Sequence, residues 1–183
     1  MRLYRKTFAE LTTDELYRIL KLRVSVFVVE QNCPYMELDG LDRNAVHVWL
    51  EDADGIQAYL RVLDRGAESE QVSIGRVIAV QRRCGLGSRI LSEGIRAAKE
   101  CFRADSIYLE AQVYAKGLYE KQGFRPISEE FLLDGIPHVK MLLDGAVWQA
   151  GGGDRCAPCR YETAALKRER NSSAGNPPGF VTK

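Results

Sequence analysis

The stretch IGRVIAVQRRCGLGSRILSEGI, residues 74–95, decides how this chain folds. It begins with an apolar run, residues 74–80, that is typical of a buried strand. A basic turn with Gly85 and Gly87 follows, and an amphipathic helix begins immediately after it. The first N–H groups of a helix have no intrahelical partner, and the peptide dipoles add partial positive charge there. A strand, a glycine turn and a helix in this order therefore predict a phosphate-binding site at the start of the helix.

The spacing of the glycines narrows the choice of ligand. The chain has no G-x-x-x-x-G-K-[ST] motif, which a P-loop requires. Ile90 occupies the position where a Rossmann fingerprint needs its third glycine. Taken alone, the turn could also be a tight connection with solvent-facing arginines. If it binds an anion, that anion is therefore not a nucleotide held in either of these two ways.

Length and composition indicate one globular domain with a single substantial core. The chain has 183 residues, of which 45% are hydrophobic and 28% charged. Its net charge of +1 argues against a protein that coats nucleic acid. Neither a signal peptide nor an apolar stretch long enough to cross a bilayer is evident. We therefore expect a cytoplasmic protein with neither nucleic acid nor a membrane as partner.

The composition changes near Gly145 and divides the chain into two parts. Residues 1–144 carry 20 Lys and Arg against 22 Asp and Glu, whereas residues 145–183 carry 6 against 3. The second part is rich in Gly, Pro and Ser and too poor in large apolar residues to offset the entropy of ordering. We expect a largely disordered basic tail with at most one short helix, residues 161–170. An arm that binds a partner is the alternative.

The cysteines predict neither a disulfide framework nor a metal site. Five cysteines at irregular spacings, in a chain without an export signal, do not form a disulfide pattern. Cys156 and Cys159 have C-x-x-C spacing, but no second such pair and no pair of histidines lies nearby. We therefore expect no bound metal.

Periodicity predicts a mixed α/β domain in residues 1–144. A helix begins after a cap at Thr12 or Thr13 and stops before Pro34, which disfavours helix in the residue that precedes it. The Asp-Gly pair at 54–55 is a hairpin signal. The other predicted helices are residues 85–102 and 115–122. The predicted strands are residues 2–8, which form a sheet edge, and 47–51, 57–63, 74–80, 106–112, 124–131 and 138–143.

Tyr119 is the second candidate for a functional role. It lies on the predicted short helix, which ends at Gly123, the residue type expected just past a helix. A neutral phenol, whose pKa is near 10, is suited to protonating a departing thiolate. An amphipathic core tyrosine would give the same pattern.

Several motifs together resemble the GCN5-related N-acetyltransferases (GNAT) over residues 1–143. The run Arg82-x-x-Gly85-x-Gly87 is similar to the [Q/R]-x-x-G-x-[G/A] diphosphate turn of that superfamily, and Tyr119 with residues 123–124 resembles its Y-x-x-x-G-F element. More specific resemblances are to the ElaA-like branch. They are carried by FVVEQNCPY at 27–35, Asp-Gly at 39–40 and DGIPH at 134–138.

The resemblance implies a GNAT fold, in which helices flank a central mixed and mostly antiparallel sheet. Its fourth and fifth strands splay apart to admit the pantetheine arm of acetyl-CoA, the implied cosubstrate. Tyr119 would be the general acid, and a backbone N–H near Val80 would polarise the thioester carbonyl. The link between strand and glycine turn is shorter than the family pattern, which could tilt the phosphate seat. The implied cosubstrate-binding residues are Ile78, Ala79 and Val80 for the pantetheine, and Arg82, Arg83, Cys84, Gly85, Leu86, Gly87 and Ser88 for the diphosphate.

Three residues are candidates for the base that deprotonates the acceptor amine. His138 can titrate near neutrality. Glu30, at the end of the first helix, could bind a cationic substrate or act as the base, and Glu110 on the splayed strand is the third candidate. His138 could instead only bond the preceding turn, Glu30 could brace the loop at residues 32–34, and Glu110 could face solvent. We expect His47 to be structural.

The resemblance implies transfer of the acetyl group of acetyl-CoA to a primary amine, in a metabolite or a peptide, by direct attack in a ternary complex. The acidic set Glu30, Glu37, Asp39 and Asp42 favours a cationic acceptor. The alternative is a catalytically weak acyl-CoA-binding sensor or partner-binding module. An exposed edge strand could also pair with a second copy to form a homodimer.

Overall fold

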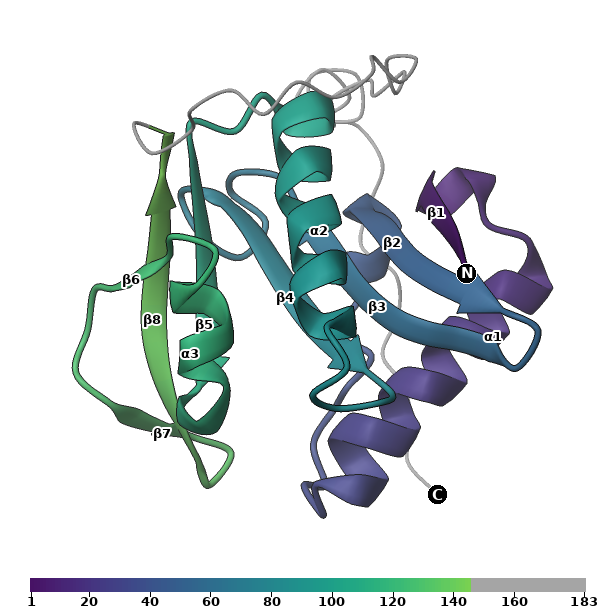
Figure 1. Ribbon diagram of the computed structural model, residues 1–183, viewed down its shortest axis with the longest axis horizontal. Coiled ribbons are helices and arrows are strands. Elements are labelled where there is room, and N and C mark those ends of the chain that lie inside the picture. Colours follow the sequence, from purple (N-terminus) through teal and green to yellow (C-terminus); the bar gives the residue numbers. More distant parts are fainter. Residues whose placement is uncertain (146–183) are drawn as a thin grey trace, which may run out of the picture.

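The computed structural model describes residues 1–145, which form a sheet with helices on both faces (Figure 1). The predicted tail beyond Gly145, its short helix and the Cys156–Cys159 pair lie outside the described residues. The strands are β1 (Arg2–Thr7), β2 (Ala45–Asp52), β3 (Gly55–Leu63), β4 (Val72–Ala79), β5 (Ser106–Gln112), β6 (Arg125–Pro126), β7 (Phe131–Leu133) and β8 (Ile136–Asp144). The longer helices are α1 (Thr13–Val24), α2 (Leu86–Phe102) and α3 (Lys116–Glu120), and the short ones are η1 (Phe8–Glu10), η2 (Ser25–Glu30), η3 (Leu41–Asn44) and η4 (Val113–Ala115).

The strands form a single mixed sheet in the order β1-β2-β3-β4-β5-β8-β6, with β7 also paired to β8. Neighbouring strands are antiparallel except for β4 and β5, which are parallel. The β2–β3 hairpin closes with Asp52 opposite Gly55, as the Asp-Gly signal predicts. The prediction of a mixed, mostly antiparallel sheet with β1 at one edge is confirmed.

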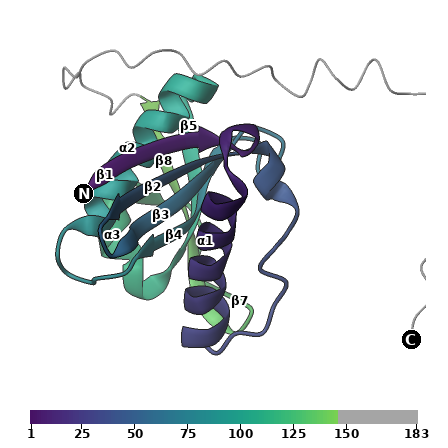
Figure 2. The same ribbon diagram turned by 90° about the vertical axis from the view of Figure 1, so that its right-hand side faces the viewer.

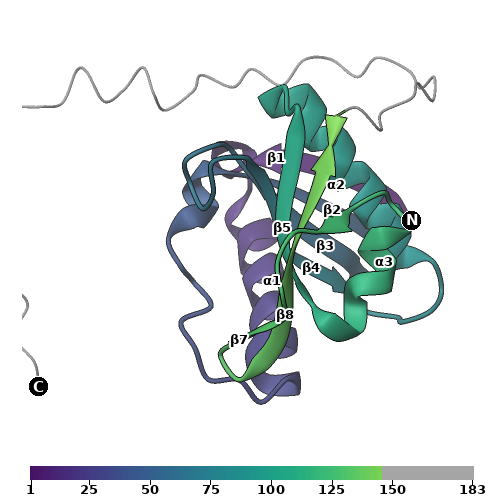
Figure 3. The same ribbon diagram turned by 90° about the vertical axis from the view of Figure 1, so that its left-hand side faces the viewer.

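The helices cover opposite faces of the sheet. Figure 2 shows α1 on one side and α2 with α3 on the other, and Figure 3 shows the same arrangement from the reverse direction. Helix α1 begins with a capping box, in which Thr12 Oγ1 accepts from the N–H of Glu15 at 3.2 Å and the Glu15 carboxylate accepts from the N–H of Thr12 at 2.9 Å. The predicted N-cap is thus confirmed at Thr12.

The hydrophobic core has two parts, one under each helix layer. Successive side chains of a strand point to opposite faces, so Val46, Val48 and Leu50 of β2 pack on the α2 side while Trp49 packs on the α1 side. The ring of Trp49 is fully buried and stacks on Tyr4 of β1, with 4.9 Å between ring centroids. Burial on both faces fixes the strand register, because a slip by one residue would turn every one of these side chains to the wrong face.

Two predicted elements differ from those observed. The first helix is regular only to Val24, and residues 25–30 continue it as a π-helix, in which the N–H of Gln31 donates to the carbonyl of Val26 at 3.2 Å. The strand predicted over residues 124–131 is instead two short strands, β6 and β7. The pairing with β8 is interrupted because the N–H of Lys140 donates to the hydroxyl of Ser128 rather than to a backbone carbonyl.

No helix within residues 1–145 is both long and apolar enough to cross a membrane.

Helix α2 approaches the sheet most closely at Gly94. A Cβ atom at this position would lie 2.6 Å from Cδ2 of Leu60 on β3, and Leu60 is fully buried. We expect Gly94→Val to lower the free energy of unfolding by about 1–3 kcal/mol, because the helix would be pushed off the sheet. Urea denaturation measures the loss.

Two further variants identify the cause of that loss. Gly117 on α3 has no neighbouring atom within 4 Å of a Cβ, so Gly117→Ala should change stability by less than about 0.5 kcal/mol. Adding Leu60→Ala to Gly94→Val should cost less than the two separate losses combined, because the first change makes room for the second. Strict additivity would rule out this contact as the cause.

Candidate active site

A gap between β4 and β5 is the dominant feature of the sheet. The two strands pair only at Val72–Ile107 and Ser73–Tyr108, and they diverge beyond these residues, as Figure 1 shows. The divergence opens a cavity of about 1100 Å³, which is lined by both strands, by α1 with η2, and by the turns that follow β4 and β5. This volume is large enough for a long, thin ligand together with a second small molecule.

The N-terminus of α2 lies at one end of the cavity. Gly85 precedes the helix with φ +85°, a left-handed conformation that favours glycine, and its carbonyl accepts the first helical bond from the N–H of Arg89 at 3.0 Å. The first-turn N–H groups of Leu86, Gly87 and Ser88 precede that bond and have no partner within the helix. Gly87 also packs closely against α3, because a Cβ there would lie 3.2 Å from Cδ2 of Leu118.

Most of the residues predicted to hold the cosubstrate line this one cavity, and two do not. The side chain of Leu86 is buried in the core under α2, so only its backbone can face a ligand. The thiol of Cys84 is exposed and donates to the carbonyl of Gln81 at 3.0 Å. The predicted residues that do line the cavity are Ile78, Ala79, Val80, Arg82, Arg83, Gly85, Gly87 and Ser88.

The open edge of β4 presents different backbone groups from those expected. The N–H of Val80 donates to the carbonyl of Gln57 at 2.9 Å, so it is already used within the sheet. It cannot also polarise a thioester carbonyl. Because N–H groups alternate in direction along a strand, those of Val77 and Ala79 point toward the gap. Just before them, Arg76 has φ +55° at an irregularity in the β3–β4 register. Such an irregularity bends the strand and changes the direction in which this edge of β4 faces.

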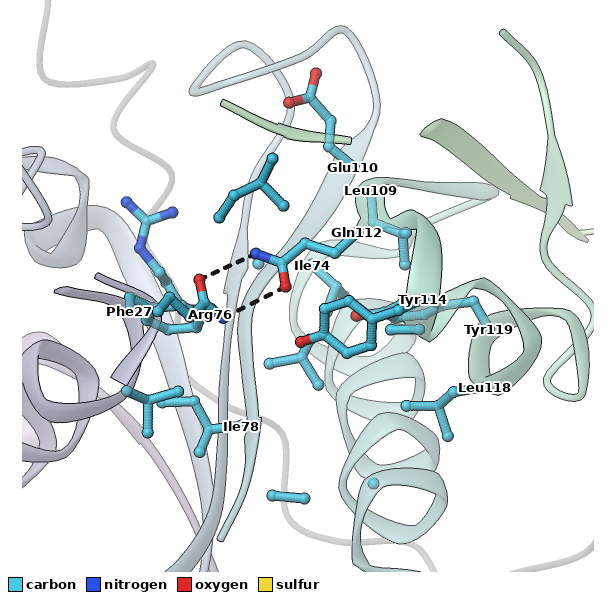
Figure 4. A pocket seen from close by; sticks show the side chains of 18 of the residues that line it. Phe27, Ile74, Arg76, Ile78, Leu109, Glu110, Gln112, Tyr114, Leu118 and Tyr119 are labelled. Atoms are coloured by element: carbon cyan, nitrogen blue, oxygen red, sulfur yellow. Dashed lines mark hydrogen bonds between the residues drawn. The ribbon is translucent and has the colours of Figure 1, made fainter. Parts of the chain in front are cut away.

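Tyr119 lies on the opposite wall of the cavity, on α3 (Figure 4). Only 7% of its surface is exposed, and its ring meets Phe124 edge-on at 6.1 Å between centroids. The chain can turn back on the tyrosine because Gly123 has φ +91° and the N–H of Phe124 donates to the carbonyl of Tyr119 at 3.2 Å. Burial, with a smaller effect of Tyr114, raises the pKa of Tyr119 well above 10, so its hydroxyl stays protonated at neutral pH.

His138 of β8 also lines the cavity, and its hydrogen bond fixes which ring nitrogen can accept a proton. Nδ1 lies 2.8 Å from the carbonyl oxygen of Ile136. A carbonyl can only accept, so Nδ1 carries the hydrogen and Nε2 has a free lone pair in the neutral ring. The bond to the preceding turn, which was the alternative to a catalytic role for His138, is therefore present. It leaves Nε2 free to act as a base.

The two carboxylate candidates are already engaged by neighbouring side chains. Glu30 forms an ion pair with Arg82 across the cavity mouth, and both side chains are largely exposed. Glu110 accepts from the hydroxyl of Tyr108 at 2.7 Å. Burial, and then this bond to Glu110, raise the pKa of Tyr108. Neither carboxylate is placed like His138, in a buried position with a free acceptor.

Comparison with known proteins identifies this architecture. The family model described as "Acetyltransferase (GNAT) domain" matches residues 21–144. The chain belongs to the GNAT superfamily. Protein ElaA of Escherichia coli is 37% identical over 137 residues, which cover 73% of this chain and 90% of ElaA.

Solved structures agree with the ElaA-like branch. The crystal structure of E. coli ElaA matches with a TM-score of 0.73 and 34% identity, covering 78% of this chain and 99% of that one. An acyl-CoA N-acyltransferase from Pseudomonas aeruginosa matches with the same TM-score and coverage and 39% identity. The GNAT fold with splayed β4 and β5, predicted from the motifs, is confirmed.

A buried network of charges, which the sequence did not reveal, lies behind the α1 side of this GNAT cavity, and of its residues only Arg76 lines the cavity itself. Arg23 of α1 binds Glu37 at 2.9 Å and Asp42 at 2.5 Å, and both arginine and glutamate are almost fully buried. Arg61 of β3 binds Asp42 at 3.1 Å and also pairs with Asp39. The chain segment 37–42 is thereby fixed to α1 and to the sheet.

Arg76 joins the same network from the irregular position on β4. Its guanidinium binds Glu37 at 2.7 Å and Asp39 at 3.1 Å, and it lies over the rings of Phe27 and Tyr35. Burial, the largest single influence, would raise the pKa of Asp39, but the bond and charge of Arg61, the N–H of Leu41 and the charge of Arg76 together lower it to about 2. The expectation that Glu37, Asp39 and Asp42 attract a cationic acceptor is therefore wrong, because these carboxylates are neutralised by arginines.

His47 lies in the core beside this network, as a structural residue. Its Nε2 donates to the carbonyl of Asp42 at 3.1 Å, and its Nδ1 accepts from the hydroxyl of Tyr59 at 2.8 Å. Burial lowers the pKa of His47 from 6.5 to about 4. The carbonyl and the hydroxyl could also both accept from a charged ring, so burial, and not the loss of a hydrogen bond, keeps the ring neutral.

Stability should therefore fall between pH 6.5 and pH 4. In this window the unfolded chain binds a proton at His47 and the folded chain does not, so acid favours unfolding, by at most about 3 kcal/mol. Urea denaturation at several pH values measures the slope. His47→Gln keeps both hydrogen bonds but cannot titrate, so this part of the slope should disappear. An unchanged slope in that variant would contradict the assignment. Asp39 acts at lower pH, because its pKa is about 2.

Proposed function

We propose that this protein transfers the acetyl group of acetyl-CoA to a primary amine. The observation that carries the proposal is the open gap between β4 and β5, with the N-terminus of α2 at one end and Tyr119 and His138 on its walls. The first-turn amides of α2 would bind the diphosphate, with Arg82 or Arg83 adding charge-assisted contacts. The exposed backbone of Ala79 would bind the pantetheine, as a neighbouring strand would.

The residues on the walls suggest a division of labour. Nε2 of His138 would take a proton from the bound ammonium, which frees the lone pair on its nitrogen. That lone pair attacks the thioester carbon, while the N–H of Val77 binds the oxygen on which negative charge develops. As the C–S bond breaks, the nitrogen would release its second proton to solvent, and the hydroxyl of Tyr119 would give its proton to the departing sulfur and recover one from solvent. His138 would likewise pass its proton to solvent. Much of the rate enhancement would come from holding the two reactants together.

A direct assay separates this enzyme from a sensor that only binds acyl-CoA. The protein is mixed with acetyl-CoA and a panel of polyamines, amino acids and lysine peptides, and free thiol is followed against a blank without amine. Calorimetry measures binding of CoA in parallel. Binding without amine-dependent thiol release would favour the sensor, and absence of binding would defeat both proposals.

Tyr119→Phe should lower kcat by about 100-fold or more, because the thiolate would leave without a proton donor. The affinity for CoA should stay within about twofold of wild type, since the hydroxyl acts only as the thiolate leaves. Thiol release and calorimetry give the two values. Tyr17→Phe is the matched control, because Tyr17 is exposed on α1 and does not line the cavity. Equal losses of turnover in both variants would remove Tyr119 from the reaction.

Glu30→Gln should tighten CoA binding by up to about fivefold, the range expected for an exposed ion pair. The change frees Arg82 for the diphosphate and removes a negative charge from the cavity mouth. Calorimetry at low ionic strength measures it. The kcat should fall far less than the about 100-fold expected for loss of a general base. A fall of that size would instead make Glu30 the base.

A further inference from the structure

Two glutamine side chains meet across the gap between β4 and β5. Gln31 follows η2, and Gln112 is the last residue of β5. Nε2 of Gln31 donates to Oε1 of Gln112 at 3.3 Å, and Nε2 of Gln112 donates to Oε1 of Gln31 at 3.1 Å. Figure 4 shows both bonds as dashed lines from Gln112 in the middle of the cavity. The two amides thus satisfy each other in a closed ring, which we call the amide pair.

The amide pair lies beside the residue proposed as the base. Gln112 is directly opposite His138 in the β5–β8 register. Residues paired in this way point to the same face, with their Cβ atoms about 4.5–5.5 Å apart. Gln31, Gln112 and His138 all line the cavity. Two amide oxygens and the free Nε2 of His138 are therefore available in one region, and all three groups accept hydrogen bonds.

Three converging acceptors fit a primary ammonium group, which has three N–H donors. The acidic residues 37, 39 and 42 cannot supply this recognition, because arginines neutralise them. A neutral amide pair can open at small cost, since each of its two hydrogen bonds has a modest net value in a site that water can reach. Each amide that leaves its partner can then accept from the ammonium, and such charge-assisted bonds are stronger than those they replace.

We propose that Gln31 and Gln112 form the acceptor-binding site and that they exchange their mutual bonds for bonds to a primary ammonium. Their two oxygens hold two of its hydrogens, and the third hydrogen points to Nε2 of His138, which removes it. The lone pair freed in this way first faces His138, and the amine turns before it attacks the thioester carbon. The amide pair selects primary over secondary amines, because an N-methyl group would take the place of one donor. This inference rests on the proposed function.

The kinetic test uses Gln112→Met, which keeps the length of the side chain but cannot accept a hydrogen bond from an ammonium. With the best amine of the panel, the acceptor KM should rise about tenfold or more, as expected for loss of a bond to a charged group. The preference for that amine over its N-methyl derivative should fall, while the KM for acetyl-CoA stays within about twofold. Unchanged acceptor KM and unchanged preference would overturn the proposal.

Gln112→Glu distinguishes binding of the acceptor from a purely structural bridge. A carboxylate can still accept from an ammonium, but it cannot donate to Oε1 of Gln31, so half of the amide pair is lost. We expect this variant to keep an acceptor KM near that of wild type. If Gln112→Glu and Gln112→Met raise the acceptor KM equally, the pair is a structural link and the proposal fails.

A binding measurement keeps the inference separate from the proposed reaction. The side-chain amide signals of Gln31 and Gln112 are followed by nuclear magnetic resonance in the complex with CoA, which has no acetyl group to transfer. The signals are assigned with Gln31→Met and Gln112→Met. Adding n-butylamine should shift both signals, and N-methylbutylamine should shift them less. Shifts without turnover of any amine would support the acceptor site and contradict the proposed function. Turnover without shifts would overturn the site alone.

Discussion

The parting of β4 from β5 is the constraint on which the rest of the structure depends. Backbone groups along the two facing edges have no strand partner, and such groups are costly to bury without hydrogen bonds. A gap in the middle of a sheet is stable only if its unpaired backbone groups are turned away, covered by other segments or left accessible to water or a ligand. The irregularity at Arg76 changes the direction of the β4 edge. The short helix η2 and the loop after it cover one side of the gap. What stays accessible is the cavity, which opens onto the first turn of α2.

Buried charge, rather than apolar packing, holds the covering loop in place. Three arginines from α1, β3 and β4 converge on three carboxylates of one short segment, residues 37–42. Each buried charge has an opposite partner, and removal of one would leave another buried charge without its partner. The segment therefore behaves as part of the sheet. Three arginines against three carboxylates are electrically balanced, so this network behind the cavity adds little net charge to it.

Local sequence patterns predicted most of the elements, but not the contacts between distant side chains. The strand over residues 106–112 and the helix after Gly85 were predicted within one residue, because apolar periodicity and glycine punctuation are local signals. The strand predicted over 124–131 failed where the Ser128 hydroxyl replaces a backbone partner, which no periodicity records. No local pattern marks Arg23 and Arg61 as buried or Arg76 as their neighbour. Gln31 and Gln112 are 81 positions apart, and only the folded sheet brings them together.

The π-helical turn after α1 has a consequence for how the chain can change. Hydrogen bonds from Gln31 to Val26 and from Cys33 to Val28 each span five residues, so residues 25–30 hold one residue more than an ordinary turn would. Each residue of an α-helix advances the next by about 100°. Deleting one residue here would remove the extra residue and restore a regular helix, with the following side chains close to their present directions, whereas the same deletion within α1 would turn them by roughly 100°. Residues 25–30 are therefore a place where the chain can lose one residue with little change in the direction of the groups that follow.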